Sequence, residues 1–212
     1  MNLIFDVDGT LWNTTGIVAG AWQRAADTSG LTSAKLDAET LKKEFGKTMD
    51  VIAQNVFPDI KDKEGRDKVS DLCMIFEQED LDAMDEKTTE SILYEGIRET
   101  LKDLRERNRL FIVSNCQAGY IELFIKKTRT EDLIEDHLCY GDTGLEKNGT
   151  INMLMERHNL KKEDTFYIGD TEGDQNSSRL AGIEFVFASY GFGTAKDPKQ
   201  TIETFSDLRK IF

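Results

Sequence analysis

The chain has 212 residues, and its 40 Asp and Glu outnumber 27 Lys and Arg, which gives a formal net charge of −13. That balance argues against nucleic acid as a partner, because phosphate backbones are bound by clustered Lys and Arg. No apolar run approaches the roughly 18 residues of a membrane span, and no basic region followed by an apolar stretch marks a secretory signal. With three widely spaced cysteines and no CxxC pair, we expect a cytoplasmic protein with free thiols and no membrane partner.

The first predicted element is a short buried β-strand over residues 3–7, with Asp6 and Asp8 at its carboxyl end. Side chains in a strand alternate between faces, so both carboxylates are expected to project toward one site. Gly9 then permits a sharp turn. Two like charges this close require a cation or a shared proton. The alternative interpretation is a surface turn of the Asp-Gly type.

Residues 13–89 are helix-like almost throughout. We expect one helix over residues 17–26, a second over 37–46, and a third whose apolar stripe runs through 69–76. A mostly helical insertion directly after the first strand indicates a cap over a site at the carboxyl end of that strand.

Four further strands are predicted over residues 110–114, 137–140, 166–168 and 184–188, and helical patterns lie between the later ones. Strands that alternate with helices predict right-handed βαβ units and a parallel sheet. We therefore expect an α/β fold, with a Rossmann-like parallel sheet core flanked by helices and an α-helical cap inserted after the first strand. The expected domains are a core of residues 1–13 and 90–212, and a helical cap of residues 14–89.

Polar residues follow several of these strands. Ser114 and Asn115 end the second strand, Lys147 lies in the loop after the third, and Asp170 and Asp174 follow the fourth. In an open parallel sheet, ligands bind at the carboxyl ends of the strands. Each residue alone has an ordinary explanation as a helix cap or a surface lysine, but together they predict one site.

This set of groups suits phosphoryl transfer through a covalent carboxyl phosphate. Asp6 would be the oxygen nucleophile, and the charge of the phosphoryl group must then be neutralised. A hard cation such as Mg²⁺ would do this, with oxygen ligands from Asp6, Asp170 and Asp174. The last two residues are four apart, close to one helical turn, so their side chains face together.

The remaining residues have complementary roles in this chemistry. Lys147, the Ser114 hydroxyl and the Asn115 N–H would bind the phosphate oxygens. Asp8 would protonate the leaving alcohol and later deprotonate the attacking water.

Four ordered motifs resemble those of the haloacid dehalogenase superfamily across essentially the whole chain: DVDGT at residues 6–10, VSN at 113–115, Lys147, and GDTEGD at 169–174. The helical insertion resembles the small α-helical cap of that superfamily. Residues 94–97 and 189–193 resemble segments of its phosphoglycolate phosphatase and β-phosphoglucomutase branch.

The resemblance implies a Mg²⁺-dependent phosphomonoesterase that acts on a small phosphorylated metabolite. It assigns Asp6 as nucleophile, Asp8 as acid/base, and Asp170 with the Asp8 main-chain carbonyl as metal ligands. The acid at position 8 favours phosphate esters, because dehalogenases and phosphonatases of the superfamily lack it. The chain departs from the common pattern at Lys147, which is followed by Asn-Gly rather than Pro, and at residues 12–14, near the expected cap hinge.

Two other functions stay open. A sugar-phosphate mutase of the β-phosphoglucomutase type shares the core motifs and needs additional basic groups in the cap, for which Lys47 and Thr48 are the candidates. A non-catalytic, receiver-like Mg²⁺-binding domain also carries acidic residues, a Ser or Thr and a Lys, but it lacks the second Asp and the cap. The sequence determines neither the substrate nor the oligomeric state.

Overall fold

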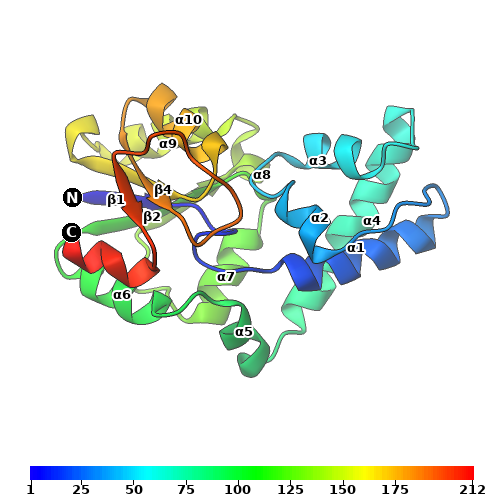
Figure 1. The fold of residues 1–212 in the computed structure, drawn as a ribbon, viewed down its shortest axis with the longest axis horizontal. Coiled ribbons are helices and arrows are strands. Elements are labelled where there is room, and N and C mark those ends of the chain that lie inside the picture. Colours follow the sequence, from blue (N-terminus) through cyan, green and yellow to red (C-terminus); the bar gives the residue numbers. More distant parts are fainter. The chain divides into compact units, whose positions relative to one another are not determined.

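The structure is a computed structural model that describes all 212 residues, and its contacts divide the chain into two compact units (Figure 1). The first unit consists of Met1–Asn13 and Ile92–Phe212, and the second of Thr14–Ser91. None of the helices combines the length and apolar character that crossing a membrane requires. The three cysteines are free thiols, as predicted.

The first unit contains a parallel sheet of six strands in the order β3-β2-β1-β4-β5-β6. The strands are β1 (Asn2–Phe5), β2 (Arg109–Ser114), β3 (Asp136–Cys139), β4 (Thr165–Gly169), β5 (Glu184–Ala188) and β6 (Gln200–Ile202). The central strands are almost continuously apolar, as expected for strands covered on both faces. The predicted α/β fold class is therefore confirmed.

The N-terminal strand β1 lies at the centre of this sheet. Asn2 pairs with Arg109 of β2 on one side and with Thr165 of β4 on the other. The chain moves outward from β1 in opposite directions through β2 and β4, which creates a topological switch point at their carboxyl ends. The fold thus places its natural ligand site next to the first strand.

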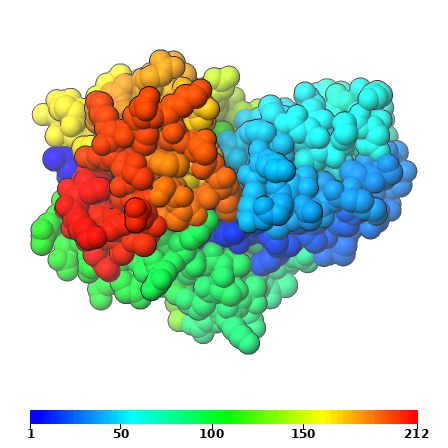
Figure 2. Space-filling view, viewed as in Figure 1, coloured from blue at the N-terminus to red at the C-terminus, as the bar shows by residue number.

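Helices cover both faces of the sheet (Figure 1). The helices of this unit are α6 (Ile97–Arg105), α7 (Tyr120–Thr128), α8 (Tyr140–Thr143), α9 (Lys147–His158) and α10 (Glu172–Ala181), with the 3-10 helices η1 (Lys162–Asp164) and η2 (Phe205–Lys210). Helices α9 and α10 bury their apolar side chains against β2, β4 and β5. On the opposite face, Phe205 of η2 packs against Phe5 at 5.7 Å between ring centroids. The C-terminal residues form part of the surface of this unit (Figure 2).

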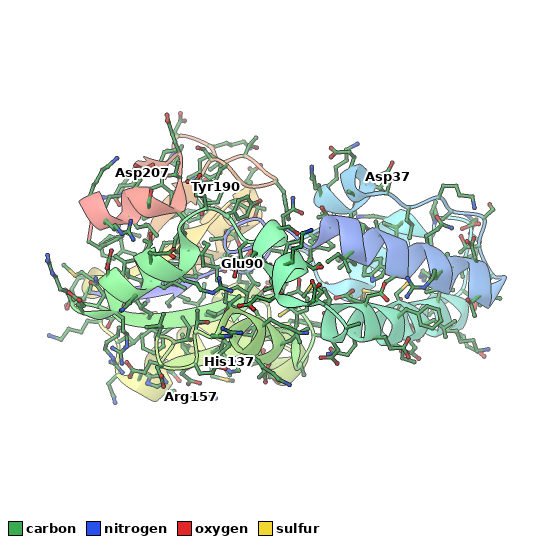
Figure 3. All side chains as sticks on the ribbon, turned by 90° about the horizontal axis from the view of Figure 1, so that it is seen from below. Asp37, Glu90, His137, Arg157, Tyr190 and Asp207 are labelled. Atoms are coloured by element: carbon green, nitrogen blue, oxygen red, sulfur yellow. The ribbon has the colours of Figure 1, made fainter.

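The second unit is entirely helical. It comprises α1 (Thr15–Ser29), α2 (Ala38–Lys42), α3 (Met49–Val56), α4 (Lys63–Asp82) and most of α5 (Glu86–Ile92). Helices α1 and α4 pack along each other, and the Trp22 indole N–H donates to the buried Glu77 carboxylate at 2.7 Å. Asp37 caps α2 by accepting from the Thr40 backbone N–H at 2.8 Å (Figure 3).

Several boundaries differ from the sequence expectation. The second predicted helix ends at Lys42 rather than Gly46, because residues 43–46 form turns. Helices α3 and α5 and strand β6 were not predicted. The edge strand β6 has three residues, two of them exposed, so it carries no readable apolar pattern.

Candidate active site

Four of the predicted site residues, Asp6, Lys147, Asp170 and Asp174, come together at the carboxyl edge of β1 and β4. Asp6 directly follows β1, and its backbone N–H donates to the Ile168 carbonyl at 2.9 Å, so the strand pairing extends to the site. Asp170 directly follows β4. One oxygen from each of Asp6, Asp170 and Asp174 lies within 4.8 Å of the others.

Lys147 joins two of these carboxylates. Its Nζ lies 3.2 Å from Asp6 Oδ2 and 2.5 Å from Asp174 Oδ1. Lys147 is the first residue of α9 rather than part of the preceding loop, so the prediction of a loop position is wrong. The helix start fixes where its side chain originates, and only 3% of that side chain is exposed.

The site carries an excess of buried negative charge. Asp6, Asp170 and Asp174 are each at most 1% exposed, and they share the single ammonium of Lys147. Burial raises the pKa of Asp6 to about 6, with Lys147 opposing the rise and Asp174 adding to it. Burial, followed by the negative charges of Asp174 and Asp6, also raises the pKa of Asp170 well above its ordinary value.

The lysine remains charged. Burial alone lowers the pKa of Lys147, but the carboxylates of Asp174 and Asp6 outweigh that effect and hold it well above its usual range. With all three carboxylates ionised, two negative charges remain in excess. Asp6 Oδ1 is moreover buried without a hydrogen-bond partner. Buried charge of this kind is costly unless it is paired, and an all-oxygen donor set suits a hard divalent cation.

Asp170 is fixed by a glycine-rich segment of residues 189–193. The Thr10 hydroxyl donates to Asp170 Oδ1 at 3.2 Å, and the Phe192 backbone N–H donates to Oδ2 at 2.7 Å. A Cβ on Gly191 would lie 2.3 Å from Asp170 Cβ and 2.5 Å from the Gly9 carbonyl oxygen, so only glycine fits. The sequence resemblance drew attention to this segment but assigned no role to Thr10 or Phe192.

The same segment is tied to the first motif by Tyr190, whose hydroxyl donates to the Thr10 carbonyl at 2.8 Å (Figure 3).

Asp174 caps a helix and also pairs with the lysine. Its Oδ2 accepts from the backbone N–H groups of Asp170 at 3.2 Å and Thr171 at 3.0 Å, and from the Thr171 hydroxyl at 2.7 Å. The Asp174 backbone N–H in turn donates to the Thr171 hydroxyl oxygen at 3.1 Å, and this bond and the one from the Thr171 N–H form a capping box at the start of α10. Asp174 Oδ1 accepts from Lys147. The Asp174 carboxylate therefore orients Lys147 and also caps the start of α10.

Asp8 occupies a different position from Asp6. Strand β1 ends at Phe5, so the predicted end of the strand at Val7 is wrong, whereas the projection of both carboxylates toward one site stays a prediction. Asp8 is half-buried in the loop after the strand, outside the cluster of three carboxylates. Its Oδ1 accepts from the Tyr120 hydroxyl at 2.7 Å.

Ser114 and Asn115 stand on the neighbouring strand end. Ser114 is the buried last residue of β2, and Asn115 follows it. The register pairs Phe5 with Ile112, so Ser114 reaches the same edge of the sheet as the residues after β1.

Lys47 and Thr48 belong to the helical unit. Lys47 Nζ forms an ion pair with Glu44 at 2.8 Å, and Thr48 occupies the N-cap position of α3. Their role in substrate specificity stays a prediction.

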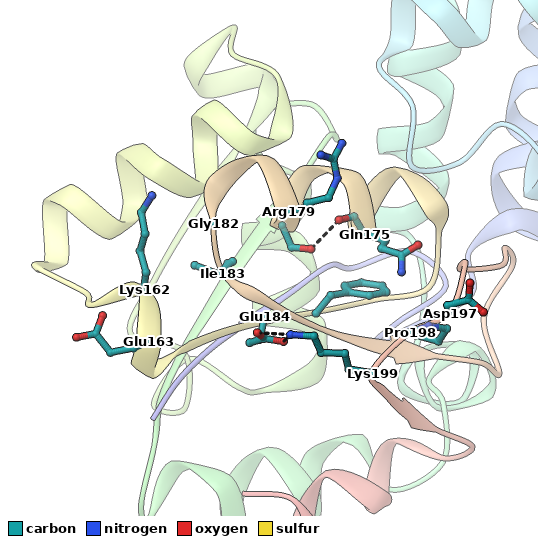
Figure 4. A pocket seen from close by; sticks show the side chains of 12 residues that line it. Lys162, Glu163, Gln175, Arg179, Gly182, Ile183, Glu184, Asp197, Pro198 and Lys199 are labelled. Carbon is teal, nitrogen blue, oxygen red and sulfur yellow. Dashed lines mark hydrogen bonds and ion pairs between the residues drawn. The ribbon is translucent and has the colours of Figure 1, made fainter.

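A pocket of about 740 Å³ lies elsewhere in the sheet-containing unit, beside α10 and β5 (Figure 4). Its lining includes an ion pair between Lys199 and Glu184 at 2.8 Å and contains none of the predicted site residues. The pocket and the buried carboxylate cluster therefore share no residue.

Comparison with known proteins agrees with this geometry. The family model of haloacid dehalogenase-like hydrolases matches residues 3–188. A phosphoglycolate phosphatase from Colwellia psychrerythraea is 28% identical over 218 residues, which cover 97% of this chain and 94% of the relative. A phosphoglycolate phosphatase from Pseudomonas putida is 21% identical and covers 99% of this chain and 77% of its own length.

Solved structures share the fold. The crystal structure of a predicted phosphoglycolate phosphatase from Haemophilus somnus has a TM-score of 0.84 at 19% identity, with 99% of this chain and 96% of that chain covered. A haloacid dehalogenase-like hydrolase from Streptococcus pneumoniae has a TM-score of 0.82 at 19% identity, covering 100% of this chain and 97% of its own.

The chain belongs to the haloacid dehalogenase-like hydrolases. Within that class it is an enzyme that hydrolyses phosphoric monoesters. The receiver-like, non-catalytic interpretation is thereby set aside.

We expect Gly191→Ala to disturb the carboxylate cluster, because the new methyl group would overlap Asp170 and the Gly9 carbonyl. Gly20→Ala in α1 is the matched control, since a Cβ there meets nothing within 4 Å. Thermal melts with and without a divalent cation measure the effect. The cation-induced rise in Tm should shrink in Gly191→Ala and persist in Gly20→Ala; an undiminished rise in both would contradict the steric argument.

Asp6→Asn should stabilise the metal-free protein in a pH-dependent way. The folded-state pKa of Asp6, about 6, exceeds its ordinary 3.8, so the folded state binds more protons and loses stability as pH rises between these values. A pKa difference of two units corresponds to about 3 kcal/mol in the free energy of unfolding. Asp6→Asn should recover this stability at pH 7.5, where Asp6 of the parent is ionised. At pH 4 the parent already carries a protonated Asp6, so the variant gains nothing. Urea unfolding in EDTA at both pH values tests this, and equal stability of variant and parent at pH 7.5 would count against a buried charge.

Proposed function

We propose that this enzyme is a Mg²⁺-dependent phosphatase that hydrolyses a small-molecule phosphate monoester through an aspartyl-phosphate intermediate on Asp6. The observation that carries the proposal is the environment of Asp6. This carboxylate is buried at the switch point of the sheet, 3.2 Å from a buried lysine, and one of its oxygens has no hydrogen-bond partner. A nucleophile for phosphoryl transfer needs such compensating positive charge around it.

The metal would be held by Asp6, the main-chain carbonyl of Asp8, and Asp170. Asp174 would complete the cluster mainly as a charge, since its oxygens already bind Lys147 and the start of α10. When bound, Mg²⁺ would neutralise the phosphate oxygens that otherwise repel Asp6. The two excess negative charges described above support a divalent rather than a monovalent ion.

The transferring phosphoryl group would be held by Lys147, Ser114 and Asn115. Lys147 supplies a permanent positive charge next to Asp6, because its pKa is held high by its two carboxylate partners. The Ser114 hydroxyl and the Asn115 backbone N–H would donate to other phosphate oxygens from the end of β2.

Asp8 would act as the general acid and base. It would give a proton to the ester oxygen as Asp6 displaces that oxygen from phosphorus, and would later take a proton from the water that releases phosphate. The Asp8 carboxyl group lies outside the carboxylate cluster, which supports this role, because a carboxyl group that coordinates the metal could not also carry a proton.

For the substrate we propose 2-phosphoglycolate, the compound named for the relatives from Colwellia psychrerythraea and Pseudomonas putida. The helical unit, Thr14–Ser91, would act as the cap, with Lys47 and Thr48 as its candidate substrate contacts. A mutase needs extra basic groups in the cap, and Lys47 is already paired with Glu44, so hydrolysis is the better-supported reaction.

We expect Asp6→Asn to abolish turnover of 2-phosphoglycolate, because an amide cannot form a stable acyl phosphate. Lys147→Ala should lower kcat by at least about 10²-fold, since its charge acts on the transition state. Lys102→Ala, an exposed lysine on α6, is the control and should behave like the parent enzyme. Steady-state phosphate release measures all three; activity of Asp6→Asn within about tenfold of the parent would remove Asp6 as nucleophile.

Removal of the metal should abolish activity reversibly. We expect EDTA to stop turnover, Mg²⁺ to restore it, and Ca²⁺ to fail as sole cation, because Ca²⁺ takes more ligands at longer distances. A larger shell would engage both oxygens of Asp6 and hold the nucleophile out of line. Full turnover in excess EDTA, or with Ca²⁺ alone, would contradict the proposed metal site.

A further inference from the structure

A chain of hydrogen bonds leads from a buried tryptophan to Asp8. The Trp12 indole N–H donates to the Tyr120 hydroxyl at 3.2 Å, and that hydroxyl donates to Asp8 Oδ1 at 2.7 Å. Trp12 lies four residues after Asp8, whereas Tyr120 is the first residue of α7, more than a hundred residues away in the sequence. The contact therefore links the segment after β1 to the segment after β2.

The direction of these bonds is fixed by chemistry. An indole N–H is a donor only, so the Tyr120 oxygen must accept from Trp12. The one proton of the tyrosine hydroxyl is then directed at Asp8 Oδ1. This oxygen accepts whether the carboxyl group is ionised or protonated, because a protonated carboxyl group retains a carbonyl oxygen as acceptor.

The donor side of this chain is rigid. Trp12 and Tyr120 are at most 2% exposed. Their rings meet edge-on at 5.6 Å between centroids, and Trp12 meets Phe124 in the same manner at 5.0 Å. The indole and the phenol thus have little freedom to turn away from the carboxyl group.

Two backbone hydrogen bonds close the loop that carries Asp8. The Leu11 backbone N–H donates to the Val7 carbonyl at 2.8 Å, and the Gly9 N–H donates to the Trp12 carbonyl at 3.0 Å. Backbone bonds hold the loop, and the tyrosine holds the side chain that projects from it.

We propose that Tyr120, oriented by Trp12, is a positioning residue for the acid/base Asp8. By holding Oδ1 as an acceptor, Tyr120 assigns the transferable proton to Oδ2 and sets the plane in which that proton is presented. This inference rests on the proposed function, since it takes Asp8 to be the acid/base.

The step that Tyr120 assists is protonation of the leaving group. As the bond between phosphorus and the ester oxygen breaks, its electron pair stays on that oxygen, an Asp6 oxygen forms the new bond to phosphorus, and the proton on Asp8 Oδ2 moves to the departing oxygen. The product alcohol leaves neutral, and Asp8 is left as a carboxylate that accepts from Tyr120. Misalignment of this proton therefore slows the hydrolysis only of those esters whose leaving group must be protonated as it departs.

Tyr120→Phe tests the proposal because it removes the hydroxyl and keeps the ring. The substrates are two alkyl esters, 2-phosphoglycolate and glycerol 2-phosphate, and the aryl ester p-nitrophenyl phosphate, whose leaving group departs as a stabilised phenolate. We expect kcat/KM for the alkyl esters to fall about tenfold, mainly in kcat, with the aryl ester changed by less than about twofold. Tyr140→Phe, in α8 of the same unit, is the matched control and should follow the parent on all three esters.

Trp12→Phe gives a second, independent measure. It should produce a smaller loss with the alkyl esters in the parent, and no additional loss in the Tyr120→Phe background, because Trp12 acts through the tyrosine hydroxyl. A purely structural role of Tyr120 would instead lower Tm and slow all three esters alike.

The outcomes separate this inference from the proposed function. If the parent hydrolyses none of the three esters, the proposed function fails. If the parent is active and Tyr120→Phe leaves the ratio of alkyl to aryl rates unchanged, the positioning role is overturned while the phosphatase stands.

Discussion

The burial of three carboxylates beside one ammonium group is the constraint on which the rest of this structure depends. Asp6, Asp170 and Asp174 would repel one another in any arrangement that lacked compensation. Lys147 provides part of it, and the helix start at α10 takes up one side of Asp174 through backbone N–H groups. The negative charge that remains uncompensated is the charge that the proposed divalent cation would neutralise.

The backbone around the cluster packs closely against Asp170. Gly191 and Gly9 approach Asp170 so closely that no side chain fits between them, and the bonds from Thr10 and Phe192 hold that carboxylate in one orientation. Loops that hold charged groups at such short range leave little room for substitution. Tight packing of these loops therefore holds the mutually repelling carboxylates in place, away from solvent.

Much of the site was predictable because parallel topology converts sequence order into spatial proximity. Short apolar runs identified five of the six strands, and the residues after β1, β2 and β4 had to meet at one edge. Lys147 was identified by its order among the motifs, although its place at the start of α9 was not. The roles of Thr10, Phe192 and Tyr120 had no such signal, because each depends on how a loop closes in three dimensions. Strand β6 was too short to leave a periodic pattern, whereas α3 carries an apolar stripe at Ile52, Ala53 and Val56 that was not recognised.

The central position of β1 has a consequence for how the chain is made. Asn2 at the start of this strand has its partners at Arg109 and Thr165, so β1 leaves the ribosome more than a hundred residues before either of its neighbouring strands. The helical unit, Thr14–Ser91, is contiguous in sequence and emerges complete in the meantime. During that interval the apolar residues of β1 lack the strands that later cover them. Asp6, at the end of β1, acquires its lysine and carboxylate neighbours only after residues 147–174 have been made.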